Sequence, residues 1–314
     1  MMPTRLAWCM TIWVVACASY AAPARAEQPA PIELLVLGSG GPGATGRAAS
    51  SYLLLLDGTP RIIVDAGPGS FVTLGKADVS LQDVDLVLLT HLHIDHAGEL
   101  PGLFKARVVS AAGPIVFNVW GPTGSAGSKQ AAYFPSTRRY LDLLFGRDGA
   151  FAYLQDFSAP MTILGHDIRT AGPDSAVPRA IYQENKLKIS AVAGHHGDAP
   201  AVIYRIDYAG KSITFSGDID AEGLPGLRSI ARGSDLLVFN SVVLDPPGSA
   251  PILYTLHTPP RAIGEVAHQA DVHGLLLSHL SPATDGQRDQ VVDSIHANFQ
   301  GPLRFAEDGI RVVP

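Results

Sequence analysis

A run of six residues, His91-Leu92-His93-Ile94-Asp95-His96, places three histidines and an aspartate directly after an apolar segment. The segment 85–90 is short and apolar, which predicts a buried β-strand ending at the run. Histidines two apart in an extended loop can turn toward one point, while Asp95 and His96 can reach a second point nearby. Packed together without a partner, these groups would repel or stay unsatisfied. The pattern therefore predicts a site for two metal ions.

Other ligand-type side chains follow later apolar strands at glycine-flanked or polar breaks. They are His195 and His196 in AVAGHHGDAP, Asp218 in ITFSGDID and His279 in LLLSHLSP. Strand ends along one edge of a sheet can converge on a single site, and a zinc ion held by two imidazoles needs at least one more protein ligand if water is to take the open position. We expect these residues to supply the missing ligands, with His195 and His196 competing for one place.

Strands and helices are expected along the whole chain after residue 31. Predicted strands cover 32–37, 51–57, 61–65, 85–90, 115–120, 187–193, 201–208, 212–216, 236–239 and 274–278. Predicted helices cover 99–106, 129–145 with a break near Pro135, 223–231, 259–269 and 287–299. The pattern is weakest over 124–188. Strands come in runs early and alternate with helices later, which favours one α/β domain over 27–314 with two mixed β-sheets and helices outside.

Residues 1–26 have the features of a secretory signal peptide. Arg5 is followed by the apolar stretch 6–18 and by Ala24-Arg25-Ala26, an A-x-A cleavage site. Lipoprotein processing at Cys17 is the alternative. Both cysteines lie in this segment, so the mature chain would contain no thiol ligand or disulfide. This segment contains two arginines and no acidic residue, so its removal lowers the formal net charge from −6 to −8.

We therefore expect a periplasmic or secreted protein without a stable membrane anchor. An acidic exported chain is poorly suited to neutralise phosphates, so no nucleic acid is expected as a partner. The expected partner is a small-molecule substrate, and a homodimer is compatible with the sequence.

The HxHxDH run, the later histidine, the S-G-D aspartate and the final histidine resemble, in this order, the metallo-β-lactamase superfamily. That resemblance implies a four-layer αββα sandwich and two metal ions. It assigns the first ion to His91, His93 and His196, the second ion to Asp95, His96 and His279, and the bridge to Asp218. His196 is preferred over His195 because it directly precedes Gly197, as in the family pattern. Asp65, in IIVDAGPG, matches an aspartate that orients ligand side chains.

Within this superfamily, the lack of cysteine after residue 26 excludes the lactamase subgroups that use a thiolate. The stretches LVLGSGGPGATGRAASSYLLLL, VWGPTG and LHTPPRAIGEVAHQADVHGLLLSHLSP resemble the branch of ribonuclease Z and the zinc-dependent arylsulfatases. His257-Thr258 matches a stretch whose histidine acts near the leaving group. Phe239-Asn240 stands where ribonuclease Z has a His-Glu pair, SGDID departs from its S-G-D-T, and no basic, glycine-rich arm is evident.

The leading hypothesis is an exported dinuclear zinc hydrolase, with manganese or iron as alternative metals, that acts on an aryl sulfate or a phosphodiester. A hydroxide between the ions would attack, because zinc lowers the pKa of bound water to near 7. Asp95 would align the nucleophile and His257 would protonate the leaving group. An aryl group could rest on Tyr133, Phe134 or Phe145. The alternatives are hydrolysis of a lactone or β-lactam, a ribonuclease Z-like phosphodiesterase, and a non-catalytic protein that binds a ligand through its metals.

Overall fold

The structure, a computed structural model, describes residues 29–314. The predicted signal peptide, 1–26, and both cysteines lie outside these residues. Across the part of the chain that is described, no helix is both long and apolar enough to cross a membrane.

The first half of the chain and the C-terminal strand build one mixed seven-stranded sheet, in the order β14-β1-β2-β3-β4-β5-β6. β1, β2 and β3 pair antiparallel, whereas β3 to β6 run parallel. β2 reads SYLLLL and is buried along its whole length, because apolar layers cover both of its faces. The strands are β1 (Ile32–Gly38), β2 (Ser51–Leu56), β3 (Thr59–Ala66), β4 (Leu86–Leu88), β5 (Ile115–Pro122), β6 (Met161–Ile168) and β14 (Arg311–Val312).

The second half builds another mixed seven-stranded sheet, in the order β13-β12-β11-β10-β9-β8-β7. Its antiparallel part is β7 to β10, and its parallel part is β10 to β13. The strands are β7 (Arg179–Glu184), β8 (Leu187–Ala193), β9 (Val202–Tyr208), β10 (Lys211–Phe215), β11 (Leu236–Asn240), β12 (Leu275–Ser278) and β13 (Leu303–Phe305).

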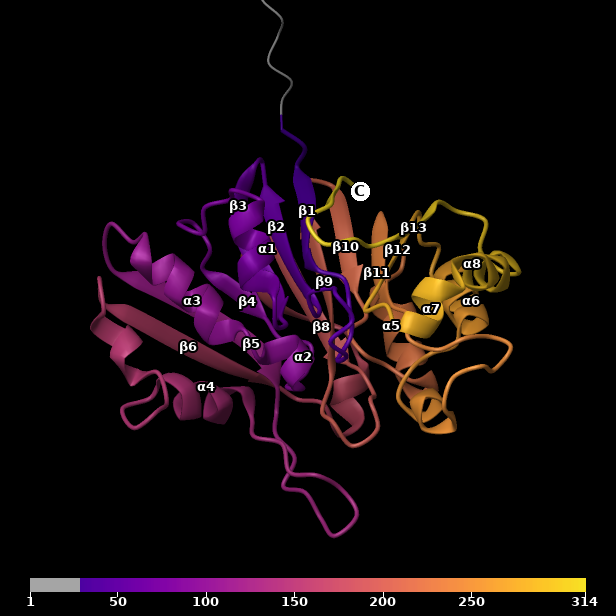
Figure 1. The fold of residues 1–314 in the computed structure, drawn as a ribbon, viewed down its shortest axis with the longest axis horizontal. Helices are drawn as coiled ribbons and strands as arrows, with labels where there is room; N and C mark the ends of the chain where they lie inside the picture. The colour runs from indigo at the N-terminus through magenta and orange to yellow at the C-terminus, as the bar shows by residue number, and fades with distance from the viewer. Residues whose placement is uncertain (1–28) are drawn as a thin grey trace, which may run out of the picture.

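The two sheets face each other and helices cover their outer faces, as Figure 1 shows. One apolar core fills the space between the sheets, a second lies under α1, α3 and α4, and a third lies under α5, α6 and α8. The α-helices are α1 (Ser70–Lys76), α2 (Ile94–Ala97), α3 (Leu100–Val109), α4 (Thr137–Phe145), α5 (Leu224–Ile230), α6 (Pro260–Gln269), α7 (Pro282–Gly286) and α8 (Arg288–His296). Short 3-10 helices are η1 (Ala152–Asp156), η2 (Pro173–Ala176), η3 (Ala221–Gly223) and η4 (Pro251–Thr255). The predicted αββα sandwich is thereby confirmed.

The region 124–188, where the sequence pattern is weakest, differs most from the prediction. Of the expected helix 129–145, only residues 137–145 are helical. The Ser136 side chain accepts the Arg139 backbone N–H and so caps the start of α4 at this point. The preceding residues form a loop that projects from the body of the molecule (Figure 1) and is closed by paired backbone groups of Ser125 and Phe134. The strands β6 and β7, each of which is an edge strand of its sheet, were not predicted.

Candidate metal centre

The candidate ligands come together where loops from both sheets meet. His91 and His93 follow β4, and α2 carries Asp95 and His96. Three further loops supply the rest, and in chain order they carry His196 after β8, Asp218 after β10 and His279 after β12. A bridge between Gly40, after β1, and Leu280, after β12, ties the two sheets together at this edge. The site is therefore assembled from strand ends that are far apart in the sequence.

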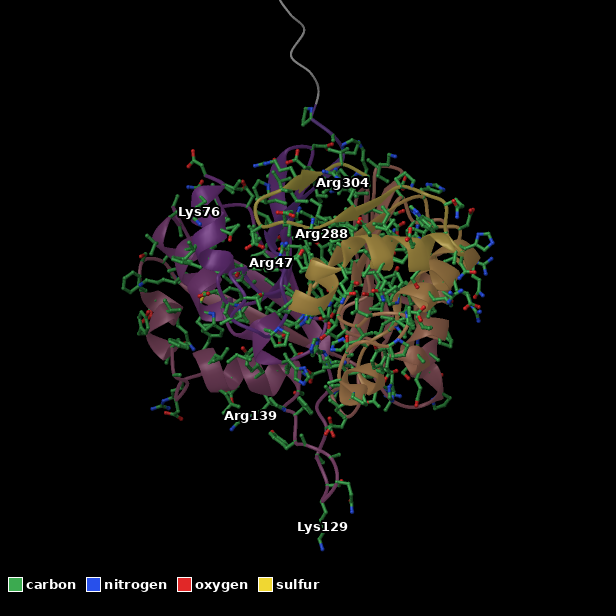
Figure 2. All side chains as sticks on the ribbon, turned by 45° about the vertical axis from the view of Figure 1, so that its right-hand side comes forward. Arg47, Lys76, Lys129, Arg139, Arg288 and Arg304 are labelled. Atoms are coloured by element: carbon green, nitrogen blue, oxygen red, sulfur yellow. The ribbon has the colours of Figure 1, made fainter. Side chains whose placement is uncertain are left out.

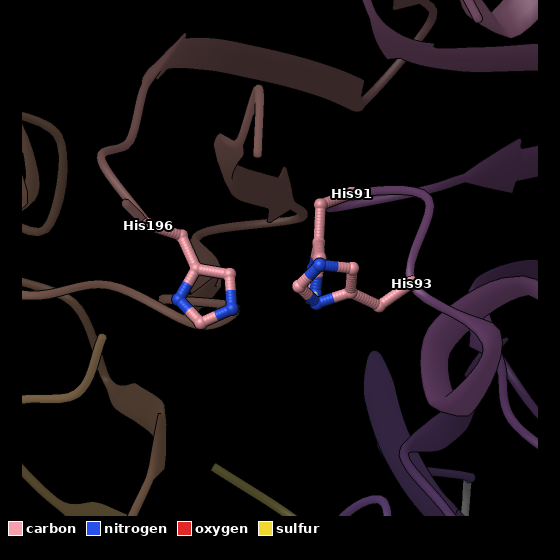
Figure 3. A group of neighbouring side chains, drawn as sticks. All are labelled: His91, His93 and His196. Atoms are coloured by element: carbon pink, nitrogen blue, oxygen red, sulfur yellow. The ribbon is translucent and has the colours of Figure 1, made fainter. Parts of the chain in front are cut away.

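The first group consists of His91, His93 and His196, whose donor atoms all lie within 4.8 Å of one another. The His91 and His93 rings project from one loop and face His196, which comes from the opposite sheet (Figure 3). His91 Nε2 lies 3.1 Å from His93 Nδ1. His91 and His196 are buried, and His93 is partly exposed. The group thus has one open side.

The second group consists of Asp95, His96, Asp218 and His279, and all four side chains are buried. Asp218 also lies next to the first group. Its Oδ2 atom is surrounded by four imidazole nitrogens, at 3.4 Å from Nε2 of His279, 3.6 Å from those of His96 and His196, and 3.9 Å from that of His91. One carboxylate oxygen therefore lies between the two groups, where a bridging ligand would be.

Two of these imidazoles, those of His96 and His196, are also hydrogen-bonded through Nδ1 to groups outside both clusters. Asp65 Oδ2 lies 2.7 Å from His96 Nδ1, and Asp65 Oδ1 accepts the Thr90 backbone N–H at 2.7 Å. His196 Nδ1 lies 2.8 Å from the Leu256 carbonyl oxygen. Asp65 and His279 both have a left-handed backbone, with φ of 56° and 53°. Non-glycine residues adopt this conformation at a cost, so the surrounding structure must hold both residues in place.

His257 lies beside both groups, whereas His195 lies outside them. The His257 ring is buried, and its centroid is 5.2 Å from that of His196 and 5.8 Å from that of His279. His195 turns away, and its Nδ1 lies 2.7 Å from Asp220 Oδ2. Of the two competing histidines, His196 is therefore the one that the fold brings to the cluster.

The pKa values of two buried histidines, one in each group, move in opposite directions. Burial and the charge of the neighbouring His96 hold the pKa of His91 well below its usual range. Burial alone would also lower the pKa of His96, but Asp65 and Asp218 raise it well above that range. Burial alone would raise the pKa of Asp218, but His279 and His96 hold it well below its usual range. His91 is thus prepared to bind a metal ion in its neutral form, and the central carboxylate of Asp218 is ionised.

The donor set and its spacing fit divalent metal ions. Zinc bonds of about 2.0–2.2 Å separate tetrahedral ligand atoms by roughly 3.3–3.6 Å. Three of the four separations around Asp218 Oδ2, 3.4–3.6 Å, match this spacing, and the fourth, 3.9 Å to His91 Nε2, is slightly longer. All four exceed the usual length of a hydrogen bond. Within residues 29–314, the buried Nε2 of His96 has no hydrogen-bond partner. A buried nitrogen aimed at two carboxylates without bonding either is explained by a cation between them.

Only one of the three aromatic residues expected to line the cleft lies beside the cluster. The Phe134 ring centroid is 5.7 Å from that of His93. Tyr133, one residue earlier in the projecting loop, is 64% exposed. Phe145 instead stacks on Phe104 in the core under α3 and α4. An apolar ring on an amphipathic helix more often faces the core, which is the reason for this difference.

Two contacts of the site have no counterpart in the sequence prediction. Thr90 holds Asp65 through both its backbone N–H and its hydroxyl group. Asn240 Nδ2 donates a hydrogen bond of 2.6 Å to Asp218 Oδ1. Asn240 could have been found from its position at the end of β11. Because β10 and β11 are parallel neighbours, their ends meet at the same edge of the sheet.

A buried cluster of imidazoles and carboxylates at one edge of an αββα sandwich, spaced as divalent metal ions require, is the arrangement of a metal-dependent protein class. A comparison with known families matches residues 44–271 to the metallo-beta-lactamase superfamily, and the chain belongs to this superfamily. The superfamily resemblance is thereby confirmed, and with it a metal-dependent hydrolase as the general class of protein.

A curated relative that matches most of the chain is named as a ribonuclease Z, and solved structures share the fold of this chain. A ribonuclease Z of Mycobacterium avium is 27% identical over 292 residues, which cover 90% of this chain and 98% of the relative. The structure of human tRNase Z, short form, has a TM-score of 0.65 at 19% identity and covers 90% of this chain and 99% of that chain. The metallo-beta-lactamase fold protein YhfI from Bacillus subtilis has a TM-score of 0.64 at 18% identity, with coverage of 90% and 99%. The two solved structures show a shared fold.

The expectation that nucleic acid is no partner of this protein is wrong, because the relative that matches 90% of the chain is named as a ribonuclease. The expectation was based on the predicted export and on the net charge of the whole chain. Binding of phosphates depends on the basic groups at the site itself, and a total charge does not report where those groups lie.

Proposed function

We propose that this protein is a dinuclear metal-dependent phosphodiesterase that cleaves RNA. The observation that carries the proposal is the position of Asp218 Oδ2 among four imidazole nitrogens from both groups, at 3.4–3.9 Å. A pair of metal ions sharing one carboxylate is suited to phosphodiester hydrolysis, because it can stabilise both the attacking and the leaving oxygen.

The residues that would hold the two ions are the two groups whose donor atoms lie close together. His91, His93 and His196 would hold one ion, Asp95, His96 and His279 would hold the other, and Asp218 would be shared. When bound, the ions would supply an acidified water and positive charge for the phosphate oxygens. Zinc agrees with this set of imidazoles and carboxylates, and manganese or iron would use the same residues.

Asp95 and His257 act on the reacting groups themselves in this proposal. Burial raises the pKa of Asp95, but the hydrogen bond from His279 and the charge of His96 outweigh it and lower the pKa below the usual value. Asp95 is therefore an ionised acceptor that can orient the attacking water. Burial lowers the pKa of His257 to about 4. At neutral pH the ring is neutral, so His257 would donate a hydrogen bond to the leaving oxygen, and the charged ring that a general acid needs is its minor form.

The projecting loop 123–136 supports RNA over a smaller ester. It brings Phe134 beside His93 and leaves Tyr133 exposed one residue away. Lys129 lies at the tip of this loop, and Arg139 of α4 lies at the same end of the molecule (Figure 2). Unstacked nucleobases stack on aromatic side chains, and basic groups beyond them can contact the phosphate backbone. Aryl sulfates lack a feature that would use these outer residues.

The proposed export of the mature chain places this activity outside the cytoplasm, so the substrate is named as RNA phosphodiesters and no particular transcript is implied. N-terminal sequencing of protein from a periplasmic fraction is expected to begin at Glu27. Recovery of the full-length chain from the cytoplasm alone would contradict export and leave the chemistry untouched.

A substrate panel tests the proposal. Zinc-loaded protein and a chelator-treated control are given a 5′-labelled oligoribonucleotide, bis-p-nitrophenyl phosphate, p-nitrophenyl sulfate and a lactone. We expect cleavage of the oligoribonucleotide and the phosphate diester, its loss with chelator, and its return with zinc. Turnover of the sulfate or the lactone without cleavage of either phosphodiester would overturn the proposal. The variant Asp218→Ala serves as the control for a contaminating nuclease.

A further inference from the structure

The two oxygens of Asp218 have different surroundings. Oδ2 faces the four imidazoles, and Oδ1 points away from them and accepts the hydrogen bond from Asn240 Nδ2 at 2.6 Å. Asn240 is buried, with 5% of its surface exposed. A carboxylate can rotate about its Cβ–Cγ bond, and such terminal torsions are broad, so a bond to one oxygen determines where the other one points.

The backbone fixes Asn240 in this position. Asn240 is the last residue of β11, between β10 and β12, and it pairs with Ser278 in β12. Its backbone N–H donates to Ser216 Oγ at 3.3 Å, two residues before Asp218. The amide is therefore carried by the sheet itself and is placed by the strand that adjoins the Asp218 loop.

We infer that Asn240 is a positioning residue, which holds Asp218 with Oδ2 between the two groups and thereby determines how tightly the second ion binds. The inference rests on the proposed pair of metal ions and does not depend on the proposed substrate. An amide donor suits this role because it carries no charge, so Asp218 keeps its full negative charge for the ions. A carboxylate in the same place would repel Asp218 or share a proton with it.

The second ion is expected to depend on this contact more than the first. The first group is complete as three imidazoles without Asp218, whereas Asp218 is one of the four residues of the second group, whose donor atoms all lie within 4.8 Å of one another. Loss of a residue that orients a ligand typically weakens metal affinity by about 10- to 100-fold. Asn240→Ala removes the donor, and Asn240→Asp also adds a negative charge at nearly the same shape.

The experiment measures zinc binding to the full chain by competition with a chromophoric chelator, and cobalt binding by its visible absorption. We expect Asn240→Ala to raise the dissociation constant of the second ion by about 10- to 100-fold and that of the first by less than about three-fold. Asn240→Asp is expected to weaken the second ion further and to change the cobalt spectrum of that site.

Ser241→Ala is the matched control. Ser241 is the next residue and is also buried, and within residues 29–314 its hydroxyl group has no hydrogen-bond partner. It should bind both ions like the unmodified chain. Thermal unfolding of each variant with chelator present shows whether the fold is kept, and the near-isosteric Asn240→Asp variant serves if Asn240→Ala unfolds.

The outcomes separate this inference from the proposed function. The role of Asn240 would be overturned if its substitution weakened the binding of both ions equally or of neither ion. It would also be overturned if the unmodified chain bound a single ion. Two tightly bound ions without cleavage of any phosphodiester would overturn the proposed substrate and leave the role of Asn240 standing.

Discussion

Gly41, in the loop after β1, lies against His279 and leaves no room for a side chain. A Cβ atom added at Gly41 would lie 2.8 Å from His279 Cε1 and 2.9 Å from Nδ1. Ordinary contact begins near 3.4 Å, so Gly41→Ala must move the imidazole by about 0.6 Å. His279 is 1% exposed and has a left-handed backbone, so few other positions are open to it. The displacement exceeds the ±0.2 Å within which metal–ligand distances are held.

We therefore expect Gly41→Ala to lower the affinity for the second zinc ion by about 10- to 100-fold and to leave the affinity for the first nearly unchanged. Overpacking should also lower the free energy of unfolding by about 1–3 kcal/mol. Chelator competition measures the first effect and thermal unfolding the second. Gly43→Ala is the control, because its added Cβ would meet only the methyl group of exposed Thr45 at 3.2 Å. If Gly41→Ala binds both ions like the unmodified chain, the assignment of His279 as a ligand is refuted.

Three further predictions concern protons, the paired histidines and the projecting loop. Because the pKa of His96 is raised and that of His91 is lowered, the second ion should displace more protons at pH 7 than the first, so affinity for the second ion should rise with pH. Calorimetry in buffers of different ionisation enthalpy measures this, and equal proton release for both ions would contradict it. His196→Ala should lose one ion whereas His195→Ala should keep two, by elemental analysis, and the reverse result would exchange their roles. Phe134→Ala should raise KM for the oligoribonucleotide by roughly five-fold or more with little change in kcat, since stacking of a base contributes about 1–3 kcal/mol; an unchanged KM would exclude a stacking role.

The sequence was most informative where ligand-type side chains are consecutive. His91 to His96 could be recognised as a site because four ligand-type side chains within six residues call for one common explanation. His196, Asp218 and His279 could be found because each follows an apolar strand, and the fold brings those strand ends to one edge.

Other features depend on tertiary contacts that no local pattern records. The role of Asn240 arises from strand order, because β11 lies beside β10 and its last residue reaches Asp218. The helix expected over 129–145 begins only at Thr137, because Ser136 caps it and the residues before it form the projecting loop. Phe145 has the spacing of a core residue and lies in the core, and Phe134 faces the cluster only because that loop folds back to it.

The central claim is that two ions, shared through Asp218, are needed to hydrolyse a phosphodiester. Its most direct test is a titration of chelator-stripped protein with zinc while hydrolysis of bis-p-nitrophenyl phosphate is followed. The structure predicts a rate that stays low up to one equivalent of zinc and reaches its plateau at two. A plateau at one equivalent, or no hydrolysis at any zinc content, would contradict the claim.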